Sequence, residues 1–312
     1  MPVAGAAPRA THGCVARQVS GSRIPELTIA TSGAAKLPTV AVCIDGKGPY
    51  RFLVSTGTGS SVVTPALARS LHLRKGSRAA IRGVTCVTSA PTTKVSNWSM
   101  SGLRLAPQTL VVAKVAGGQV SPPVKGIIGS DVLVRFGAVR IDYGSGHMLL
   151  AAKEGKAPKG NVYVLGQAKA AVPASLATGT LEVGASLRVF ESPQGTIVAA
   201  PVKISGHTEQ LAVDTGAGAS GVLPAVAQSL KLVAGGQKTG ISGVGCRGEG
   251  PTFTSRAWSL GGAPLASASL VARSIAGSVN GGLQGVLGSD VLSADGSVIV
   301  DYDAAHVWLV KG

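Results

Sequence analysis

The sequence predicts a mainly β-sheet protein built from two lobes of similar structure. Glycine contributes 44 of the 312 residues, and charged residues only 14%, a composition typical of strands joined by tight turns. The chain also repeats itself, because FLVSTGTGSSVVTPALARSLHL at 52–73 matches LAVDTGAGASGVLPAVAQSLKL at 211–232, and GIIGSDVL at 126–133 matches GVLGSDVL at 285–292. The length suffices for two domains with their own cores, so neither a metal nor a disulfide scaffold is needed.

The matched positions keep a nearly constant separation along the chain. Ser55 and Asp214, Gly129 and Gly288, and Asp142 and Asp301 are each 159 residues apart. The segments GVTC at 83–86 and GVGC at 243–246, and the residues Trp98 and Trp258, are 160 apart. One residue is therefore inserted and later removed, a change that loops tolerate.

Each copy predicts the same series of elements. An apolar strand, 40–44 or 198–204, leads through a turn with Gly46 or Gly206 to a second strand that ends in a Thr-Gly pair. A short helix that begins at a proline, PALARSLHL or PAVAQSLKL, comes next. A Gly-rich hairpin, a strand after the tryptophan and a closing pair of strands complete the copy.

The repeat also sets the expected domain boundaries. We predict an N-terminal segment at 1–35, a first lobe at 36–150, a linker at 151–193 and a second lobe at 194–312. The linker is rich in Ala, Gly, Lys and Pro, with one brief strand-like run, NVYVLG. Two copies in one chain suggest a pseudo-two-fold axis, as in a fused homodimer, and a site on that axis receives one contribution from each copy.

One motif in this frame resembles a known family. Asp214-Thr215-Gly216 follows an apolar strand, GVLGSDVL comes about 70 residues later, and the first copy repeats both at fixed spacing. The combination resembles the aspartic peptidases, and among them the retropepsin branch, over nearly all of 36–150 and 194–312. The resemblance implies an all-β bilobal acid-protease fold of two tandem retropepsin-like β-barrel lobes, each with one short helix, and the activity of an aspartic-type endopeptidase (a hydrolase).

The resemblance also gives the repeated loop residues their roles. Gly216, like Gly57, would let the chain turn sharply after the strand, where a side chain would clash with backbone from the other lobe. Thr215 and Thr56 would each bond the backbone of the opposite lobe and hold the two loops rigid. The apolar segments that end in Gly129 and Gly288 would pack beneath the loops.

The first copy departs from the family at the catalytic position, where Ser55 replaces an aspartate. Peptide hydrolysis on this fold needs two carboxyl groups that share one proton. The ionised group takes a proton from the attacking water, and the protonated group donates to the carbonyl oxygen. Asp214 would face only a hydroxyl, which can position water but is too weak an acid to protonate the substrate. Loss of a placed proton donor typically reduces the rate by about 10²–10⁴-fold.

Two hairpins resemble the flaps that close over a substrate in this family. Gly83 and Cys86 lie in the first, and Gly243 and Cys246 occupy the equivalent places in the second. Flaps exclude water and hydrogen-bond an extended peptide as an added strand would. We hypothesise that Cys86 and Cys246 can form a disulfide across the axis; the simpler alternative is that they are two separate small apolar residues.

Other site chemistries fit the sequence less well. No CxxC pair or zinc-finger spacing accompanies the four cysteines, so we expect no metal site, and we expect no cofactor. The match of GAGASG at 216–221 to a dinucleotide motif fails in the first copy and lacks the later acidic residue. Ser55 has no histidine placed by the repeat to act as its base. The repeated aspartates Asp131, Asp142, Asp290 and Asp301 are more typical of turn capping than of catalysis.

Two functions therefore remain open. The chain is either an aspartic endopeptidase that binds an extended peptide or protein substrate, its missing carboxylate supplied by a second copy, or a catalytically silent peptide-binding pseudoprotease. The charge suggests a further partner: residues 1–150 hold 17 Lys+Arg against 4 Asp+Glu, net +13, whereas 151–312 hold 12 against 10, net +2. The basic first half favours an acidic partner, or is simply a solvated surface.

The location of the protein in the cell is left open by the sequence. The first residues contain no apolar stretch of signal-peptide length, and no segment approaches a membrane span. The default expectation is cytoplasmic, or exported if the recorded start is not the true one.

Overall fold

The computed structural model describes most of the chain, in segments separated by gaps. These segments are 14, 27–32, 35–82, 87–115, 120, 122–151, 163–164, 180–192, 195–242, 244, 247–255, 257–266, 268–274 and 282–311. The predicted flap residues Gly83, Cys86, Gly243 and Cys246 lie outside them, so their roles and the Cys86–Cys246 disulfide stay predictions.

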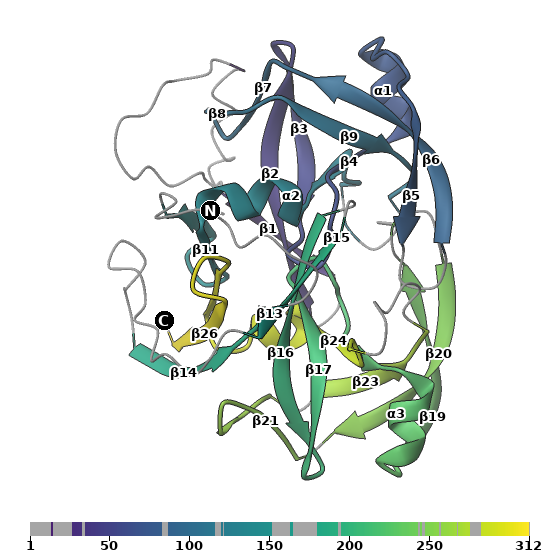
Figure 1. Cartoon of the computed structure of the whole chain (residues 1–312), viewed down its shortest axis with the longest axis vertical. Coiled ribbons are helices and arrows are strands. Elements are labelled where there is room, and N and C mark those ends of the chain that lie inside the picture. The colour runs from purple at the N-terminus through teal and green to yellow at the C-terminus, as the bar shows by residue number, and fades with distance from the viewer. Residues whose placement is uncertain are drawn as a thin grey trace, which may run out of the picture.

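The strands β1 to β10 of the first lobe form one sheet, in the upper half of Figure 1. Across the sheet the order is β5-β6-β9-β4-β10-β3-β2-β7-β8, and β1 pairs with β2. The elements are β1 Leu27–Ser32, β2 Ala35–Ile44, β3 Lys47–Val54, β4 Val62–Val63, α1 Pro65–Ser70, β5 Arg78–Arg82, β6 Val87–Val95, β7 Trp98–Met100, β8 Leu103–Leu105, β9 Gln108–Val112, β10 Gly126–Ile128, α2 Ser130–Leu133, the 3-10 helix η1 Val134–Phe136, β11 Ala138–Asp142 and β12 His147–Leu150.

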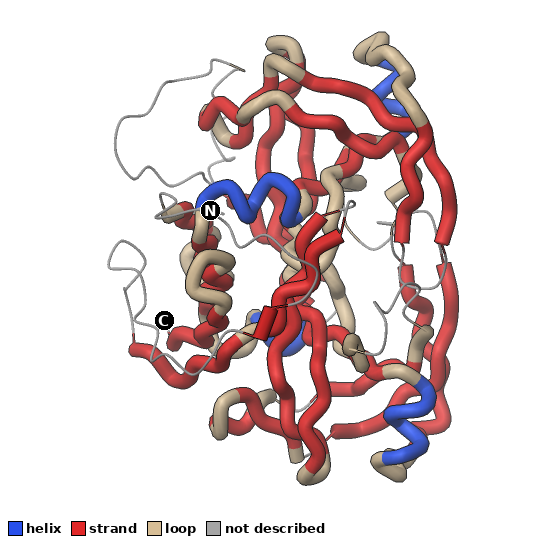
Figure 2. Tube along the Cα trace, in the orientation of Figure 1, coloured by secondary structure: helices blue, strands red, loops and turns tan. Residues whose placement is uncertain are grey.

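The second lobe repeats this order in the lower half of Figure 1. Its sheet runs β13-β15-β16-β17-β24-β18-β23-β20-β19, with β21 on β16 and β22 on β21. The elements are β15 Arg188–Ser192, β16 Gly195–Ile204, β17 His207–Asp214, β18 Gly221–Val222, α3 Pro224–Ser229, β19 Ala234–Ser242, β20 Arg247–Ser255, β21 Trp258–Leu260, β22 Ala263–Pro264, β23 Ala268–Ala272, β24 Gly285–Gly288, α4 Ser289–Leu292, β25 Ser297–Asp301 and β26 His306–Lys311. Strands dominate both lobes (Figure 2), as the composition predicted.

A third sheet joins the two lobes. Its order is β12-β11-β25-β26-β14, so each lobe contributes its last two strands and β14, Thr180–Ser186, is added at the edge. β11 and β25 pair antiparallel across the lobe boundary, with Ala138 opposite Asp301 and Asp142 opposite Ser297. The backbone hydrogen bonds of this sheet therefore fix the lobes relative to each other.

The segment predicted to be a linker contributes strands of its own. Besides β14, it contains β13, Tyr163–Val164, and β15. β15 pairs antiparallel with β16 as β1 pairs with β2, so residues 188–192 continue the sheet of the second lobe.

Each lobe has a second short helix in addition to the predicted one. α1 and α3 begin at the expected prolines, and the Thr64 side chain caps α1 by accepting from Leu67 N. α2 and α4 form where the chain turns after Gly129 and Gly288, and in α2 the Gly129 carbonyl accepts from the N–H groups of Val132 and Leu133. Four residues are too few to show helical periodicity in a sequence. No described helix has the length and apolar character of a membrane span.

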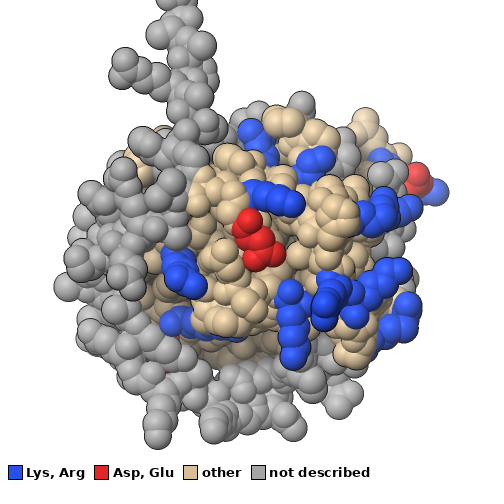
Figure 3. Space-filling view, turned by 90° about the horizontal axis from the view of Figure 1, so that it is seen from above, with Lys and Arg blue, Asp and Glu red and all other residues tan. Residues whose placement is uncertain are grey.

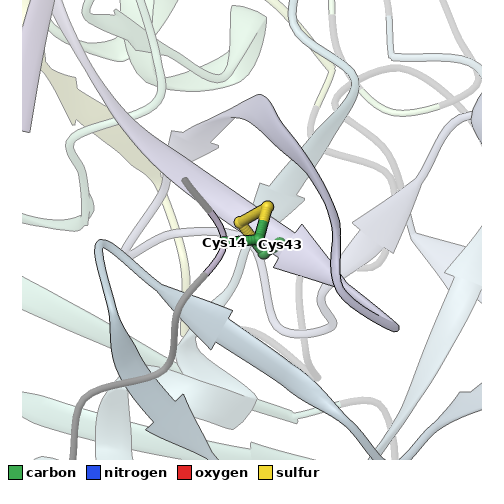
Figure 4. Close-up of a disulfide and its surroundings, with 2 residues drawn as sticks. All are labelled: Cys14 and Cys43. Atoms are coloured by element: carbon green, nitrogen blue, oxygen red, sulfur yellow. A yellow bond between two sulfur atoms is a disulfide. The ribbon is translucent and has the colours of Figure 1, made fainter. Parts of the chain in front are cut away.

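A disulfide between Cys14 and Cys43 ties the N-terminal segment to β2 (Figure 4). The two residues are 29 positions apart in sequence, and their Cα atoms lie 5.6 Å apart. The sequence analysis did not predict this bond, because Cys14 lies outside the repeat and the equivalent of Cys43 in the second lobe is Lys203. Disulfides of this kind persist in oxidising surroundings.

The outer end of the first lobe carries many basic side chains. In Figure 3, Lys and Arg side chains surround a small acidic area on this face. The exposed basic residues of the lobe are Lys36, Lys47, Arg69, Arg74, Lys75, Arg78, Lys94, Arg104, Lys114, Lys125 and Arg135.

Candidate active site

Ser55 and Asp214 meet where the two lobes come together. Ser55 directly follows β3, and Asp214 is the last residue of β17. Both strands run parallel to the strand that precedes the second short helix of their own lobe, β10 and β24 respectively. The Ser55 hydroxyl donates a hydrogen bond to Asp214 Oδ1 over 2.7 Å. The matched positions of the repeat are therefore in direct contact.

Three donors converge on one oxygen of the Asp214 carboxyl group. Besides the Ser55 hydroxyl, Oδ1 accepts from the N–H of Gly216 at 2.8 Å and from that of Gly57 at 3.3 Å. Among the described residues none donates to Oδ2, and Asp214 is only partly buried, so this oxygen can accept from water.

The hydroxyl of Ser55 is itself held in place. Ser55 is 1% exposed, and its Oγ lies 2.7 Å from Thr58 Oγ1 as well as from Asp214. A hydroxyl has one proton, so while Ser55 donates to the carboxylate, Thr58 supplies the proton of the second bond. The Ser55 proton is then committed to Asp214.

The two threonines of the loops lock the lobes together. Thr56 Oγ1 donates to the Val213 carbonyl at 2.7 Å, and Thr215 Oγ1 donates to the Val54 carbonyl at 3.0 Å. Each hydroxyl also accepts from the backbone N–H of the other threonine, at 3.2 and 3.3 Å. Both side chains are fully buried. These four bonds cross the lobe boundary and are nearly symmetric.

Gly57 and Gly216 allow the two loops to approach this closely. A Cβ on Gly216 would lie 2.6 Å from Ser55 Cβ, and one on Gly57 would overlap the Asp214 side chain. The sequence analysis expected the clash to be with backbone of the other lobe. It is with the catalytic-position side chain instead, because the loops face each other through Ser55 and Asp214 and not through their main chains.

Gly129 and Gly288 lie beneath the loops, beside a buried serine and aspartate in each lobe. In the first lobe Asp131 accepts from both the N–H and the hydroxyl of Ser61, whose Oγ accepts from Gly129 N at 2.9 Å. Asp290, Ser220 and Gly288 repeat this arrangement in the second lobe. Burial raises the pKa of both aspartates, and the serine hydrogen bonds oppose that shift.

The repeated aspartates therefore support the loops and do not enter the site. Asp142 and Asp301 accept from backbone N–H groups of the turns that follow them. Ser61 and Ser220 were missed by the sequence analysis, although their place at matching positions of the repeat was a usable signal. The Tyr143 hydroxyl contacts Ser289 Oγ across the lobes at 3.1 Å, whereas the hydroxyl of the equivalent Tyr302 has no hydrogen-bond partner.

One contact joins the hairpin of the second lobe to the first lobe. Val244, between β19 and β20, forms an isolated bridge with Val115, which follows β9. Val244 is buried in an apolar cluster of the first lobe that includes Leu53, Val62 and Ile127. This cluster borders the site, because Leu53 Cδ2 lies 3.2 Å from the position of a Cβ on Gly216.

Comparison with known proteins supports the resemblance seen in the sequence. Residues 40–132, most of the first lobe, match the family model described as aspartyl protease. The match covers the lobe with Ser55, and the second lobe repeats it with Asp214 in the corresponding place.

The prediction of an all-β bilobal fold is confirmed by the two equivalent sheets, and the predicted resemblance to the aspartic peptidases is confirmed over residues 40–132. Among solved structures, the chain is similar to an aspartic proteinase from Irpex lacteus, with 13% sequence identity, a TM-score of 0.48, and coverage of 93% of this chain and 97% of that one. No curated protein sequence matches the chain.

Proposed function

We propose that this chain binds an extended peptide between its two lobes, across Asp214, and hydrolyses it slowly or not at all. The observation that carries the proposal is the hydrogen bond from Ser55 Oγ to Asp214 Oδ1. Efficient hydrolysis needs two facing carboxyl groups, whereas Asp214 faces a hydroxyl.

The contacts of Asp214 allow one half of the reaction and not the other. An ionised Asp214 can draw a proton from a water bound at Oδ2 while that water attacks a peptide carbonyl. The carbonyl oxygen then needs a proton donor, and the Ser55 hydroxyl is far too weak an acid for that step. Its proton is also held by Asp214. Hydrolysis by the chain alone is therefore about 10²–10⁴-fold slower than with a complete pair.

Peptide binding is supported by features that hydrolysis does not require. The loops at 57–60 and 216–219 are partly exposed around Asp214, so a ligand can reach them. The threonine bonds hold these loops in one geometry, which reduces the entropy lost on binding. A relation to aspartyl proteases makes an extended peptide the natural ligand.

The same contacts weigh against supply of the missing carboxylate by a second copy of the chain. Two copies of Asp214 can meet only if Thr56 and Thr215 separate and β11 leaves β25. Each step exposes buried backbone hydrogen-bonding groups, with a cost of about 1–3 kcal/mol for every group left unpaired.

The proposal is tested with a library of extended peptides, incubated with the native chain from acidic to neutral pH. Binding is followed by fluorescence polarisation and cleavage by mass spectrometry. We expect peptides that bind without measurable cleavage, or with a trace of cleavage that disappears in Asp214→Asn.

Two results would contradict the proposal. If no peptide in the library binds, the chain is not a peptide-binding module. If cleavage rises more than proportionally with protein concentration, two copies cooperate and the chain is a peptidase.

A further inference from the structure

The two lobes differ in two side chains that lie next to each other beside the site. β4 pairs with β9 so that Val62 lies opposite Val111, and β18 pairs with β23 so that Gly221 lies opposite Val271. Two residues further on, Ala113 and Arg273 make the same backbone bond, to Val63 and Val222. Val62 and Ala113 of the first lobe therefore correspond to Gly221 and Arg273 of the second.

Gly221 leaves the room that the Arg273 side chain occupies. A Cβ on Gly221 would lie 3.2 Å from Arg273 Nε. In the first lobe the valine side chain at position 62 fills the equivalent place, next to the small Ala113. Where the first lobe has the larger Val62 and the smaller Ala113, the second lobe has Gly221 and the long, positively charged Arg273.

Arg273 is buried without partners for two of its nitrogens. The residue is 5% exposed, and neither Nε nor Nη2 has a hydrogen-bond partner. Within the described segments no carboxylate forms an ion pair with Arg273. Burial of an unpaired charged group is costly unless a ligand supplies the missing partner.

The position of Arg273 places it near the catalytic carboxylate. In the first lobe the corresponding wall packs against Leu53 beside the site and contacts Val244 of the opposite hairpin. Burial lowers the pKa of Arg273, and the negative charges of Asp214 and Asp290 oppose that shift. Arg273 thus lies within electrostatic range of Asp214 and remains unpaired.

We propose that Arg273 selects the peptide bound at the site by receiving a carboxylate of that peptide on Nε and Nη2. The inference rests on the proposed peptide-binding function and adds the chemistry of the ligand to it. Nε and Nη2 share one edge of the guanidinium group, and two parallel N–H donors on one edge match the two oxygens of a carboxylate. The net charge of +15 further favours an acidic ligand.

Both nitrogens are shielded from solvent, so the carboxylate reaches them only when neighbouring residues move aside. Opening of this kind accompanies substrate entry in sites that close over their ligands. The same shielding strengthens the ion pair once it forms, because water no longer competes for the guanidinium.

The test compares peptides that differ in a single group. One series carries Asp or Glu at each position in turn, the second carries Asn or Gln there, and both are made with a free or an amidated C-terminus. Binding is measured on the native chain, on Arg273→Met and Arg273→Lys, and on Lys114→Met as the control. Lys114 is an exposed cation near the corresponding position of the first lobe, so the control loses the same charge.

We expect the native chain to bind one acidic peptide about ten- to hundredfold more tightly than its amide counterpart. Arg273→Met abolishes the preference, Arg273→Lys reduces it and Lys114→Met keeps it. A preference that follows the free C-terminus identifies the terminal carboxylate as the ligand, and one that follows a side chain identifies an acidic residue.

Stability of the variants provides an independent measurement. If Arg273 serves a ligand, Arg273→Met folds at least as stably as the native chain in urea, because it removes an unpaired buried charge. Peptides that bind without acid preference, or a preference that survives in Arg273→Met, overturn this inference and leave the proposed function standing. If no peptide binds, both are overturned.

Discussion

The first and second lobes share one framework and differ in their chemistry. The contacts that hold the loops in place occur in matching pairs: Thr56 with Thr215, Ser61 with Ser220, and Asp131 with Asp290. The groups that could act on a ligand do not match. Ser55 stands opposite Asp214, and Val62 with Ala113 corresponds to Gly221 with Arg273.

The difference separates residues that maintain the fold from residues that define the activity. The paired contacts join buried polar groups, whose loss is costly in either lobe. The positions that differ between the lobes border the site, where a change of side chain alters charge and acidity without breaking the framework. Substitutions that make the lobes more alike, or less alike, should therefore have distinct effects.

The largest effect is expected where the lobes are made alike at the axis. Ser55→Asp restores a second carboxyl group 159 positions before Asp214, in a loop whose backbone is already placed. We expect peptide cleavage to rise by about 10²–10⁴-fold at acidic pH, where one carboxyl group can hold the shared proton. The measurement is kcat/KM against pH with a peptide that binds the native chain.

The matched control for this prediction is Ser55→Asn, because asparagine has nearly the shape of aspartate but no acidic group. The double variant Ser55→Asp with Asp214→Asn should also be inactive. Activity that persists in the double variant would mean that the pair at the axis is not the catalytic centre.

The disulfide between Cys14 and Cys43 ties the N-terminal segment to the first lobe, and its removal should lower the stability of the chain. The bond closes a loop of 29 residues between Cys14 and Cys43. We expect Cys14→Ser to lower the free energy of unfolding by about 2–4 kcal/mol, as the unfolded chain gains freedom. Urea unfolding of the native chain and the variant measures the loss.

Reduction of the native chain is the control for the disulfide, and it should reproduce the effect of Cys14→Ser. Equal midpoints for native and variant chains under oxidising conditions would show that the bond contributes nothing to stability.

The threonine contacts test the symmetry of the framework. Thr56→Val and Thr215→Val each keep the side-chain shape while leaving a buried carbonyl and a buried N–H unpaired. We expect each to lower the free energy of unfolding by about 1–3 kcal/mol, and by similar amounts. A large loss of unfolding free energy for one variant and none for the other would show that the two threonines contribute unequally to stability.

The smallest effect concerns the dependence of stability on pH. Burial raises the pKa of Asp131 and Asp290 above the ordinary value of 3.8, so the folded chain keeps these protons to higher pH than the unfolded chain does. The stabilisation from this difference is complete below pH 3.8 and is lost as pH rises through the raised values.

We therefore expect both aspartates to make unfolding easier as pH increases from 3.8. Urea unfolding at several pH values, on the native chain and on Asp131→Asn with Asp290→Asn, measures the effect. The variant is less stable at every pH, because an amide cannot accept both serine bonds, but its curve should be flatter. A steeper curve in the variant would contradict the assigned direction.

The fold was predictable from the sequence because the repeat supplied each element twice. Positions such as Gly129 and Gly288 gave the register, and the Thr-Gly pairs marked the ends of β3 and β17. The duplication also made Ser55 visible, since a lone serine in a loop carries no information and a serine matched to Asp214 does.

Features without a counterpart in the repeat could not be predicted. Cys14 lies before the first copy, so nothing in the sequence paired it with Cys43. Arg273 was not singled out, because its significance depends on Gly221, about 50 residues earlier in the chain and adjacent to it in space. The Tyr143–Ser289 contact likewise occurs once, because the hydroxyl of the equivalent Tyr302 forms no hydrogen bond, so the repeat did not indicate it.

The sheet shared between the lobes bears on how the chain acquires its structure during synthesis. β11 and β12 leave the ribosome long before β25, the strand that β11 must pair with. Until then the edge of β11 offers unpaired backbone groups, and contacts so distant in sequence form slowly. The pairing of β11 with β25 should therefore form late in synthesis. A fragment that ends at residue 150 should associate with other chains through the free edge of β11.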